Sequence, residues 1–164
     1  MTAVYDAYRK ACAKPFGRQA FSLAYMFKAP YFSTVRPWIQ QMEPNRAVVR
    51  IRKRWHVQNH IGTVHALAIA NAMEAAMGLV AEATIPADLR WLPRGIELDY
   101  LTKTPGDVTC TAQTDPADWA KEPPFDVPVR VTATLDDGTV VVRGVIPIYV
   151  SQIKTATEKA AQPA

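Results

Sequence analysis

Cysteine is scarce in this sequence: only Cys12 and Cys110 occur, far apart in a chain of 164 residues. Small secreted domains that depend on disulfides are rich in closely spaced cysteines, so this pattern argues against a disulfide framework and indicates a reducing compartment. The N-terminal residues also lack a hydrophobic run followed by a small-residue cleavage site. We therefore expect a cytoplasmic protein.

A strong charge of one sign is also missing. The formal net charge is +4, and charged residues make up 21% of the chain. No expected helix carries clustered Lys or Arg, so we expect no nucleic-acid partner. The mild positive charge is compatible with a small anionic ligand.

A long uninterrupted hydrophobic run is absent as well. The most apolar stretch, residues 61–81, contains His65, Asn71 and Glu74 and lacks basic or aromatic flanks on both sides. A membrane-spanning helix needs about 20 mostly apolar residues with such flanks. We therefore expect no membrane span and no membrane partner.

Metal ligands are equally sparse. His56, His60 and His65 are the three histidines of the chain, and no cysteine or carboxylate lies beside them to complete a zinc site. The sequence therefore predicts no metal and no separate cofactor.

The chain is instead a succession of short patterned segments. Apolar residues at helical spacing predict two N-terminal helices, the second with Ala20, Leu23, Ala24 and Phe27 on one stripe. A later helix, rich in Ala and Met, is apolar nearly all round, which is typical of a buried helix. The expected order is helices 2–13 and 16–28, strands 34–42 and 47–55, a helix from 63 or 64 to 81, and strands 94–102, 108–114, 127–135 and 139–150.

Turn-forming clusters at residues 43–46, 103–107 and 136–138 predict three hairpins between these strands. Pro128 and Pro147 fall inside expected strands, and because proline has no backbone N–H they indicate edge or bulge positions.

This order predicts an α+β fold in which an antiparallel sheet wraps one long central helix. We expect a helical lead-in over residues 1–31, one domain over 32–151, and a flexible or weakly helical tail over 152–164. A curled sheet of this kind leaves one edge uncovered, so we also expect a homo-oligomer.

Glu74 is the only charged residue in the central apolar stretch. Burial disfavours an ionised carboxylate, which suits such a group to act as a base or a nucleophile. Its helical neighbours include Ala70, Asn71, Met77 and Gly78, and the small residues leave room for a ligand. The alternative is a structural carboxylate that Asn71 or a backbone amide satisfies.

The entry to this helix, residues 59–66, is the second candidate element. The first amides of a buried helix have no partner within it and can bind the oxyanion that forms on a carbonyl. Gly62 permits a tight approach, and Asn59 offers both a donor and an acceptor. Ordinary turn formation and capping explain Asn59 and Gly62 equally well.

Together, Asn59, His65 and Glu74 resemble the motif of the hotdog-fold thioesterases, in the branch that contains phenylacetate-pathway and hydroxybenzoyl-CoA enzymes and a related group of unassigned function. In that branch an Asn or Gln precedes the helix, a His-Gly-Gly or similar triplet opens it, and an acid follows nine residues after the His. The element order matches over residues 32–150. In place of the paired glycines this chain has Ala66 and Leu67.

The resemblance implies cleavage of acyl-CoA or acyl-carrier-protein thioesters, with coenzyme A only as part of the substrate. Glu74 would be the base or nucleophile, and Asn59 would orient water or substrate. The Ala66 N–H would polarise the carbonyl, with the His65 N–H as a second candidate donor. Active sites would form between the chains of a dimer, or of a dimer of dimers. The expected substrate contacts are Gly62, Leu67, Asn71, Met77 and Gly78.

The phosphates of coenzyme A are expected at basic side chains, for which Arg52, Arg54 and Lys103 are the candidates. A solvated strand face is the alternative for each of them. The bulk of Leu67 favours a second hypothesis, a non-catalytic protein that binds acyl-CoA or another lipid in the same groove. A hydratase of the same fold ranks last, because no Asp occurs in the helix entry.

Overall fold

The computed structural model describes residues 2–153, so the predicted tail falls outside the described residues from 154 onward. Between them lie three α-helices, seven strands and three short 3-10 helices. The α-helices are α1 (Ala3–Cys12), α2 (Gly17–Lys28) and α3 (Ala66–Thr84). The strands are β1 (Trp38–Glu43), β2 (Arg46–Ile51), β3 (Leu89–Pro93), β4 (Glu97–Tyr100), β5 (Val108–Gln113), β6 (Phe125–Thr134) and β7 (Val140–Gln152). The 3-10 helices are η1 (Pro30–Thr34), η2 (Trp55–Val57) and η3 (Pro116–Trp119).

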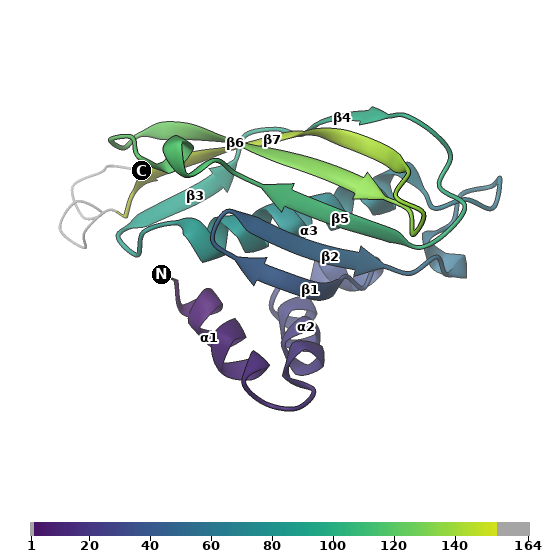
Figure 1. The fold of residues 1–164 in the computed structure, drawn as a ribbon, viewed down its shortest axis with the longest axis horizontal. Helices are drawn as coiled ribbons and strands as arrows, with labels where there is room; N and C mark the ends of the chain where they lie inside the picture. The colour runs from purple at the N-terminus through teal and green to yellow at the C-terminus, as the bar shows by residue number, and fades with distance from the viewer. Residues whose placement is uncertain (1, 154–164) are drawn as a thin grey trace, which may run out of the picture.

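The strands form one antiparallel sheet in the order β1-β2-β5-β6-β7-β3, and β4 also pairs with β7. The sheet lies across α3, while α1 and α2 lie below it in the view of Figure 1. This arrangement confirms the predicted α+β fold, with an antiparallel sheet packed on one long helix and a helical lead-in. Tyr5, Tyr8 and Phe21 of the lead-in belong to the same hydrophobic core as the sheet and α3.

The central helix begins at Ala66, two or three residues later than the sequence suggests, because His65 caps it. His65 has an extended backbone, and its Nδ1 accepts the Leu67 N–H at 3.1 Å. The helix continues to Thr84, three residues past the predicted end. Its most apolar 18-residue window has a mean hydropathy of 1.3 and is 72% buried within the fold, as expected for a core helix.

In the lead-in, Thr2 caps α1 as its residue type suggests, by accepting the Tyr5 N–H at 3.3 Å. The predicted apolar stripe of α2 lies at the surface: Leu23 is 64% exposed and Phe27 is 90% exposed. The opposite face is buried, since Ser22 Oγ accepts the Ile39 N–H of β1 at 3.1 Å. That bond and the packing around it leave the large apolar side chains of α2 at the surface.

Two predicted hairpins are confirmed, β1–β2 and β6–β7. The third, between β4 and β5, is wrong: β4 pairs with β7, and β5 pairs with β2 and β6. The connecting loop crosses to the start of α3 instead, where the buried Thr104 accepts the Val64 N–H at 2.9 Å through its backbone carbonyl. Strand β3 was not predicted, because Pro86 and Pro93 suggest only chain breaks.

Pro128 and Pro147 lie directly opposite each other in the β6–β7 ladder. Both strands are interior to the sheet, yet each proline lies at a local gap. Strand β5 pairs only with residues 130–134 of β6, and Pro147 falls between the residues of β7 that pair with β3 and with β4. At both positions no neighbouring strand needs a backbone N–H, which is why proline, which lacks this donor, is accommodated.

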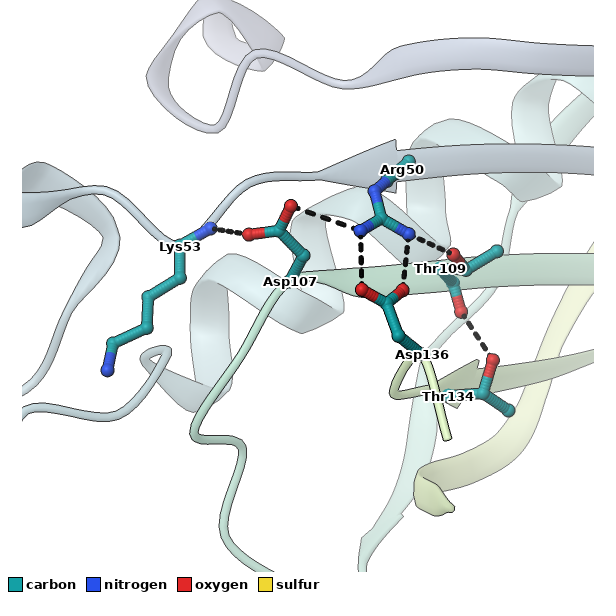
Figure 2. A network of polar contacts seen from close by, with 6 residues as sticks. All are labelled: Arg50, Lys53, Asp107, Thr109, Thr134 and Asp136. Atoms are coloured by element: carbon teal, nitrogen blue, oxygen red, sulfur yellow. Dashed lines mark hydrogen bonds and ion pairs between the residues drawn. The ribbon is translucent and has the colours of Figure 1, made fainter. Parts of the chain in front are cut away.

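Arg50 is the centre of a network of polar contacts on the sheet (Figure 2). Its guanidinium donates to Asp136 at 2.6 and 2.9 Å and to Asp107 at 3.1 Å. Asp107 also accepts the backbone N–H of Lys53 at 2.9 Å. The network joins β2, the start of β5 and the β6–β7 turn, so Arg50 is held in place as a structural group.

Candidate functional site

Glu74 lies half-buried in the middle of α3, on the side that faces the connection between β3 and β4. It lines a cavity of about 310 Å³. The other lining residues are Pro93, Arg94, Gly95, Ile96 and Ile146. The lone acid of the central apolar stretch is thus reachable from outside the core.

The carboxylate of Glu74 has no hydrogen bond or ion pair with any residue from 2 to 153. Arg94 shares the cavity, but its Nε donates to Asp126 at 2.9 Å and its guanidinium lies 4.5 Å above the ring of Tyr149. Arg94 is therefore held by Asp126 and Tyr149 and does not pair with Glu74. A half-buried carboxylate without a partner is suited to accept a proton from a bound molecule.

Asn59 holds the turn that precedes α3. Its side-chain oxygen accepts the backbone N–H groups of Ile61 at 3.2 Å and Thr63 at 3.1 Å, while its side-chain amide donates to Thr63 Oγ1 at 2.8 Å. Gly62 takes the left-handed φ of 75° that this turn needs. In this chain alone Asn59 and Gly62 therefore act as turn residues.

In the first turn of α3, one amide has no acceptor among residues 2–153. The Leu67 N–H is taken by the His65 side chain, and the N–H groups of Ala68 and Ile69 donate to the His65 carbonyl. The His65 N–H is not available either, because it donates to the Val57 carbonyl at 2.8 Å. Over residues 2–153 no acceptor is found for the Ala66 N–H, the amide that the motif assigns to carbonyl polarisation.

A cavity of about 190 Å³ lies beside this first turn and brings His65, Leu67 and Asn71 together. Its lining is completed by Tyr31, Thr34 and Val35 from η1 and the residue after it, by His56, Val57 and Gln58 from η2 and the residue after it, and by Ala68. Asn71 is only 7% exposed, and its Oδ1 has no hydrogen-bond partner in the part of the chain that the structure describes. Leu67, which also lines the cavity, is 71% exposed.

The other expected substrate contacts lie away from the Glu74 cavity. Met77 is 1% exposed and belongs to the core. Gly78 is covered, because a Cβ placed there would lie 3.5 Å from both Trp91 and the Tyr25 hydroxyl. The space that small residues leave beside Glu74 is thus filled at this end by aromatic side chains.

Within one chain, Ala66 and Glu74 do not meet. They are eight residues apart on the same helix, which corresponds to about 12 Å along its axis at a rise of 1.5 Å per residue. The cavity of Glu74 shares no lining residue with the cavity beside His65. Within one chain, the Glu74 carboxylate and the first amide of α3 therefore lie in two separate places.

Sequence reasoning missed two residues: Tyr25, which contacts α3, and Arg94, which lines the Glu74 cavity. The Tyr25 hydroxyl donates to the Ala75 carbonyl at 3.5 Å, and burial, with smaller contributions from the charges of Glu74 and Glu82, raises the pKa of this phenol above its usual range. The sequence does not indicate either placement, because Tyr25 is positioned by α2 and Arg94 by the β3–β4 connection, and both segments are distant from Glu74 in the chain.

The expected phosphate-binding residues are only partly brought together. Arg52 and Arg54 line one cavity of about 320 Å³ with Arg50, which its two aspartates already engage. Lys103 is exposed in the loop before β5 and does not line that cavity. Within residues 2–153 no group of three or more His, Cys, Asp or Glu side chains is placed to hold a metal ion.

Comparison with solved structures places this chain in the hotdog class of α+β folds. A probable thioesterase of unknown function from Pseudomonas aeruginosa, PA5026, superposes with a TM-score of 0.71 at 16% identity, over 78% of this chain and 91% of that one. The thioesterase HI1161 from Haemophilus influenzae superposes with a TM-score of 0.66 at 9% identity, over 77% and 85% of the two chains. At such identities the likeness shows the fold alone.

Residues 17–150 match the family described as a domain of unknown function, DUF4442, and the chain belongs to that family. The structural-genomics target APC5556 is similar to it at 37% identity and a TM-score of 0.79, over 92% of this chain and 99% of that one. Among curated proteins, none matches the chain significantly.

Proposed function

We propose that this protein hydrolyses acyl-CoA thioesters, with Glu74 as the base and the Ala66 amide as the oxyanion donor. The observation that carries the proposal is a half-buried Glu74 in an open cavity, on the same helix as the Ala66 amide, where neither group has a partner among residues 2–153. The fold shared with thioesterases adds support, at the level of the fold alone.

In the proposed reaction, the thioester carbonyl oxygen accepts a hydrogen bond from the Ala66 N–H, at the positive end of the α3 dipole. Glu74 takes a proton from a water molecule, whose oxygen attacks the carbonyl carbon. When the tetrahedral intermediate collapses, the C–S bond breaks, and the proton held by Glu74 passes to the thiolate leaving group. The products are a carboxylic acid and a free thiol.

Because Ala66 and Glu74 of one chain are about 12 Å apart along the helix, we propose that each site combines the amide of one protomer with the acid of its partner. The β3–β4 side of the sheet is the candidate interface. It carries the exposed apolar side chains Leu92, Ile96, Tyr100 and Leu101. The opposite edge, β1, is covered by α2, whose Ser22 already accepts the Ile39 N–H.

The decisive experiment measures thiol release from a panel of alkyl and aryl acyl-CoA substrates, and from acyl-carrier protein. We expect turnover in the wild type, and a loss of at least 100-fold in kcat for Glu74→Gln, as for removal of a general base. Glu82→Gln is the matched control, because Glu82 is the other carboxylate of α3 and binds Trp91 Nε1 at 3.0 Å. That variant should keep its turnover.

Full turnover in Glu74→Gln would exclude the proposed chemistry. Saturable binding of an acyl-CoA without thiol release over hours would favour the alternative, a non-catalytic acyl-CoA or lipid-binding protein. Both outcomes are read on a folded protein, because a glutamine side chain has nearly the size of a glutamate side chain. In addition, Glu74 has no side-chain bond within residues 2–153 that the substitution could remove.

A further inference from the structure

Two adjoining cavities lie between α2, η1 and the start of β1, away from the Glu74 cavity. Their volumes are about 680 and 320 Å³, and they share Arg36, Trp38 and Arg54 in their linings. Neither has a lining residue in common with the Glu74 cavity. We call the two together the α2–β1 groove.

The larger part of the groove has an apolar wall. Leu23, Met26 and Phe27 of α2 face it, and Trp38 closes the other side. Leu23 and Phe27 remain at the surface because the opposite face of α2 is attached to β1 through Ser22. A volume of several hundred Å³ with apolar walls is typical of small-molecule sites, which generally fall between about 300 and 1,000 Å³.

The smaller part is strongly basic. Arg36, Arg52 and Arg54 line it, and no Asp or Glu contributes to either cavity. In the part of the chain that the structure describes, none of these three arginines forms an ion pair. Arg50, at the same cavity, is already bound by its aspartates, so three guanidinium groups remain for a ligand.

Arg36 has a backbone conformation that is uncommon outside glycine, with φ of 52°. Its N–H donates to the Phe32 carbonyl at 3.0 Å, which fixes the turn between η1 and β1. Such a conformation costs free energy and persists where the surrounding structure imposes it. The turn carries Arg36 into the lining of both cavities at once, at the junction of the apolar wall and the basic end.

From this charge complementarity we propose that the α2–β1 groove binds a monomeric single-chain lipid with a phosphate headgroup. The phosphate lies among Arg36, Arg52 and Arg54, whose planar guanidinium groups match phosphate oxygens. The alkyl chain lies against Leu23 and Phe27. A concave groove suits one molecule, whereas a bilayer surface would require no cavity.

The test is a titration of the full chain with lauroyl lysophosphatidic acid below its critical micelle concentration, followed by calorimetry and Trp fluorescence. We expect one molecule per chain, and a Kd at least 10-fold weaker in Arg36→Gln/Arg54→Gln and in Phe27→Ser. Arg130→Gln, an exposed arginine of β6 with no ion pair among the described residues, is the matched control and should bind as the wild type does.

Comparison ligands make the outcome decisive. Inorganic phosphate and dodecyl maltoside should each bind at least 10-fold more weakly, since the first lacks the alkyl chain and the second lacks the phosphate. Equal binding of phosphate alone, binding only to phosphatidylcholine vesicles that contain 20% phosphatidic acid, or displacement of the lipid by free coenzyme A would each overturn the proposal. So would binding that the groove variants leave unchanged. Hydrolysis of thioesters plays no part in these readouts, so failure here and failure of the proposed function are distinguishable.

Discussion

Two hydrogen bonds of the Asn59 side chain reach Thr63 and close the turn before α3, from Asn59 Nδ2 to Thr63 Oγ1 at 2.8 Å and from the Thr63 N–H to Asn59 Oδ1 at 3.1 Å. A third bond joins Oδ1 to the Ile61 N–H. Because each such bond contributes about 1 kcal/mol and the turn is partly exposed, we expect Asn59→Ala to lower the free energy of unfolding by about 1–2 kcal/mol. Urea unfolding followed by circular dichroism measures the change.

Asn59→Asp separates this turn role from a role in catalysis. The aspartate keeps both backbone acceptor bonds, and the Thr63 hydroxyl can reverse its direction and donate to it. We expect a stability close to that of the wild type. If the folded Asn59→Asp protein loses thioester hydrolysis, Asn59 also orients substrate or water; if Asn59→Ala is as stable as the wild type, the turn role is wrong.

The Arg50–Asp136 pair predicts a dependence of stability on acid pH. Hydrogen bonding to Arg50 lowers the pKa of Asp136 below its ordinary value of 3.8. A carboxyl group whose folded pKa is depressed stabilises the fold above its unfolded pKa, and that stabilisation is lost as the pH falls through the lowered folded value. Asp136→Asn should therefore be less stable than the wild type at pH 6, and the gap should narrow below pH 4.

Urea midpoints at pH 6 and pH 3 test this expectation. Asp99→Asn is a suitable control, because Asp99 lies 3.8 Å from Arg143 and both side chains are largely exposed. It should show little change at either pH, since exposed pairs contribute little. A gap between the wild type and Asp136→Asn that stays constant across this range would show that the pair does not act through ionisation.

The buried Cys110 thiol leads us to expect that the stability of the fold decreases at alkaline pH. Its thiol is fully buried in β5, and burial raises its pKa from 9.0 to about 12. A raised pKa means that the fold holds the proton more tightly than the unfolded chain does, so stability is retained below pH 9 and falls as the pH rises toward 12. Wild-type stability should fall between pH 9 and 11 by up to about 1.4 kcal/mol per pH unit more than that of Cys110→Ala.

Thermal or urea unfolding of the two proteins in parallel isolates the thiol, because Tyr8 and Tyr25 titrate in both. Cys110→Ala should be less stable at pH 7, where it leaves a small cavity, and should lose that deficit as the pH rises. Parallel stability curves for the two proteins would contradict the assignment of a buried, protonated thiol.

Much of the fold was predictable from local patterns. The apolar character of α3 on all sides indicates a buried helix, and the turn residues of the β1–β2 and β6–β7 hairpins specify strands whose partners are adjacent in sequence. Strand β4 was mispaired because its partner is β7, more than 40 residues away. No local signal distinguishes that pairing from a hairpin with β5.

In the candidate site, too, features that depend on local sequence were predictable and features that depend on long-range packing were not. Glu74 stands out in the sequence as a lone acid in an apolar helix, and in the structure it lines an open cavity. The coverage of Gly78 by Tyr25 and Trp91 could not be foreseen, because it depends on how α2 and β3 pack against α3. Likewise, the capture of Arg50 by Asp107 and Asp136 brings together three segments that are distant in the chain.

The proposal that each active site is built from two chains can be tested by complementation between two variants that are expected to be inactive. Ala66→Pro removes the one amide proposed to bind the oxyanion, and proline is favoured at the first position of a helix, where its φ fits and its N–H is not needed. The extended His65 backbone, with ψ of 137°, is also the conformation that precedes proline. We therefore expect Ala66→Pro to fold normally and to lose most of its thioester hydrolysis, as does Glu74→Gln.

When the two variants are unfolded together in equal amounts and refolded, half of the dimers should contain one chain of each kind. If a site combines Ala66 of one chain with Glu74 of its partner, each mixed dimer has one intact site, and the mixture should recover about a quarter of the wild-type activity. If both residues act within one chain, every site carries a defect and the mixture stays inactive. Because the two variants start from the same low background, recovery of activity cannot come from either one alone, and its absence in a mixture shown to contain mixed dimers would rule out a site built from two chains.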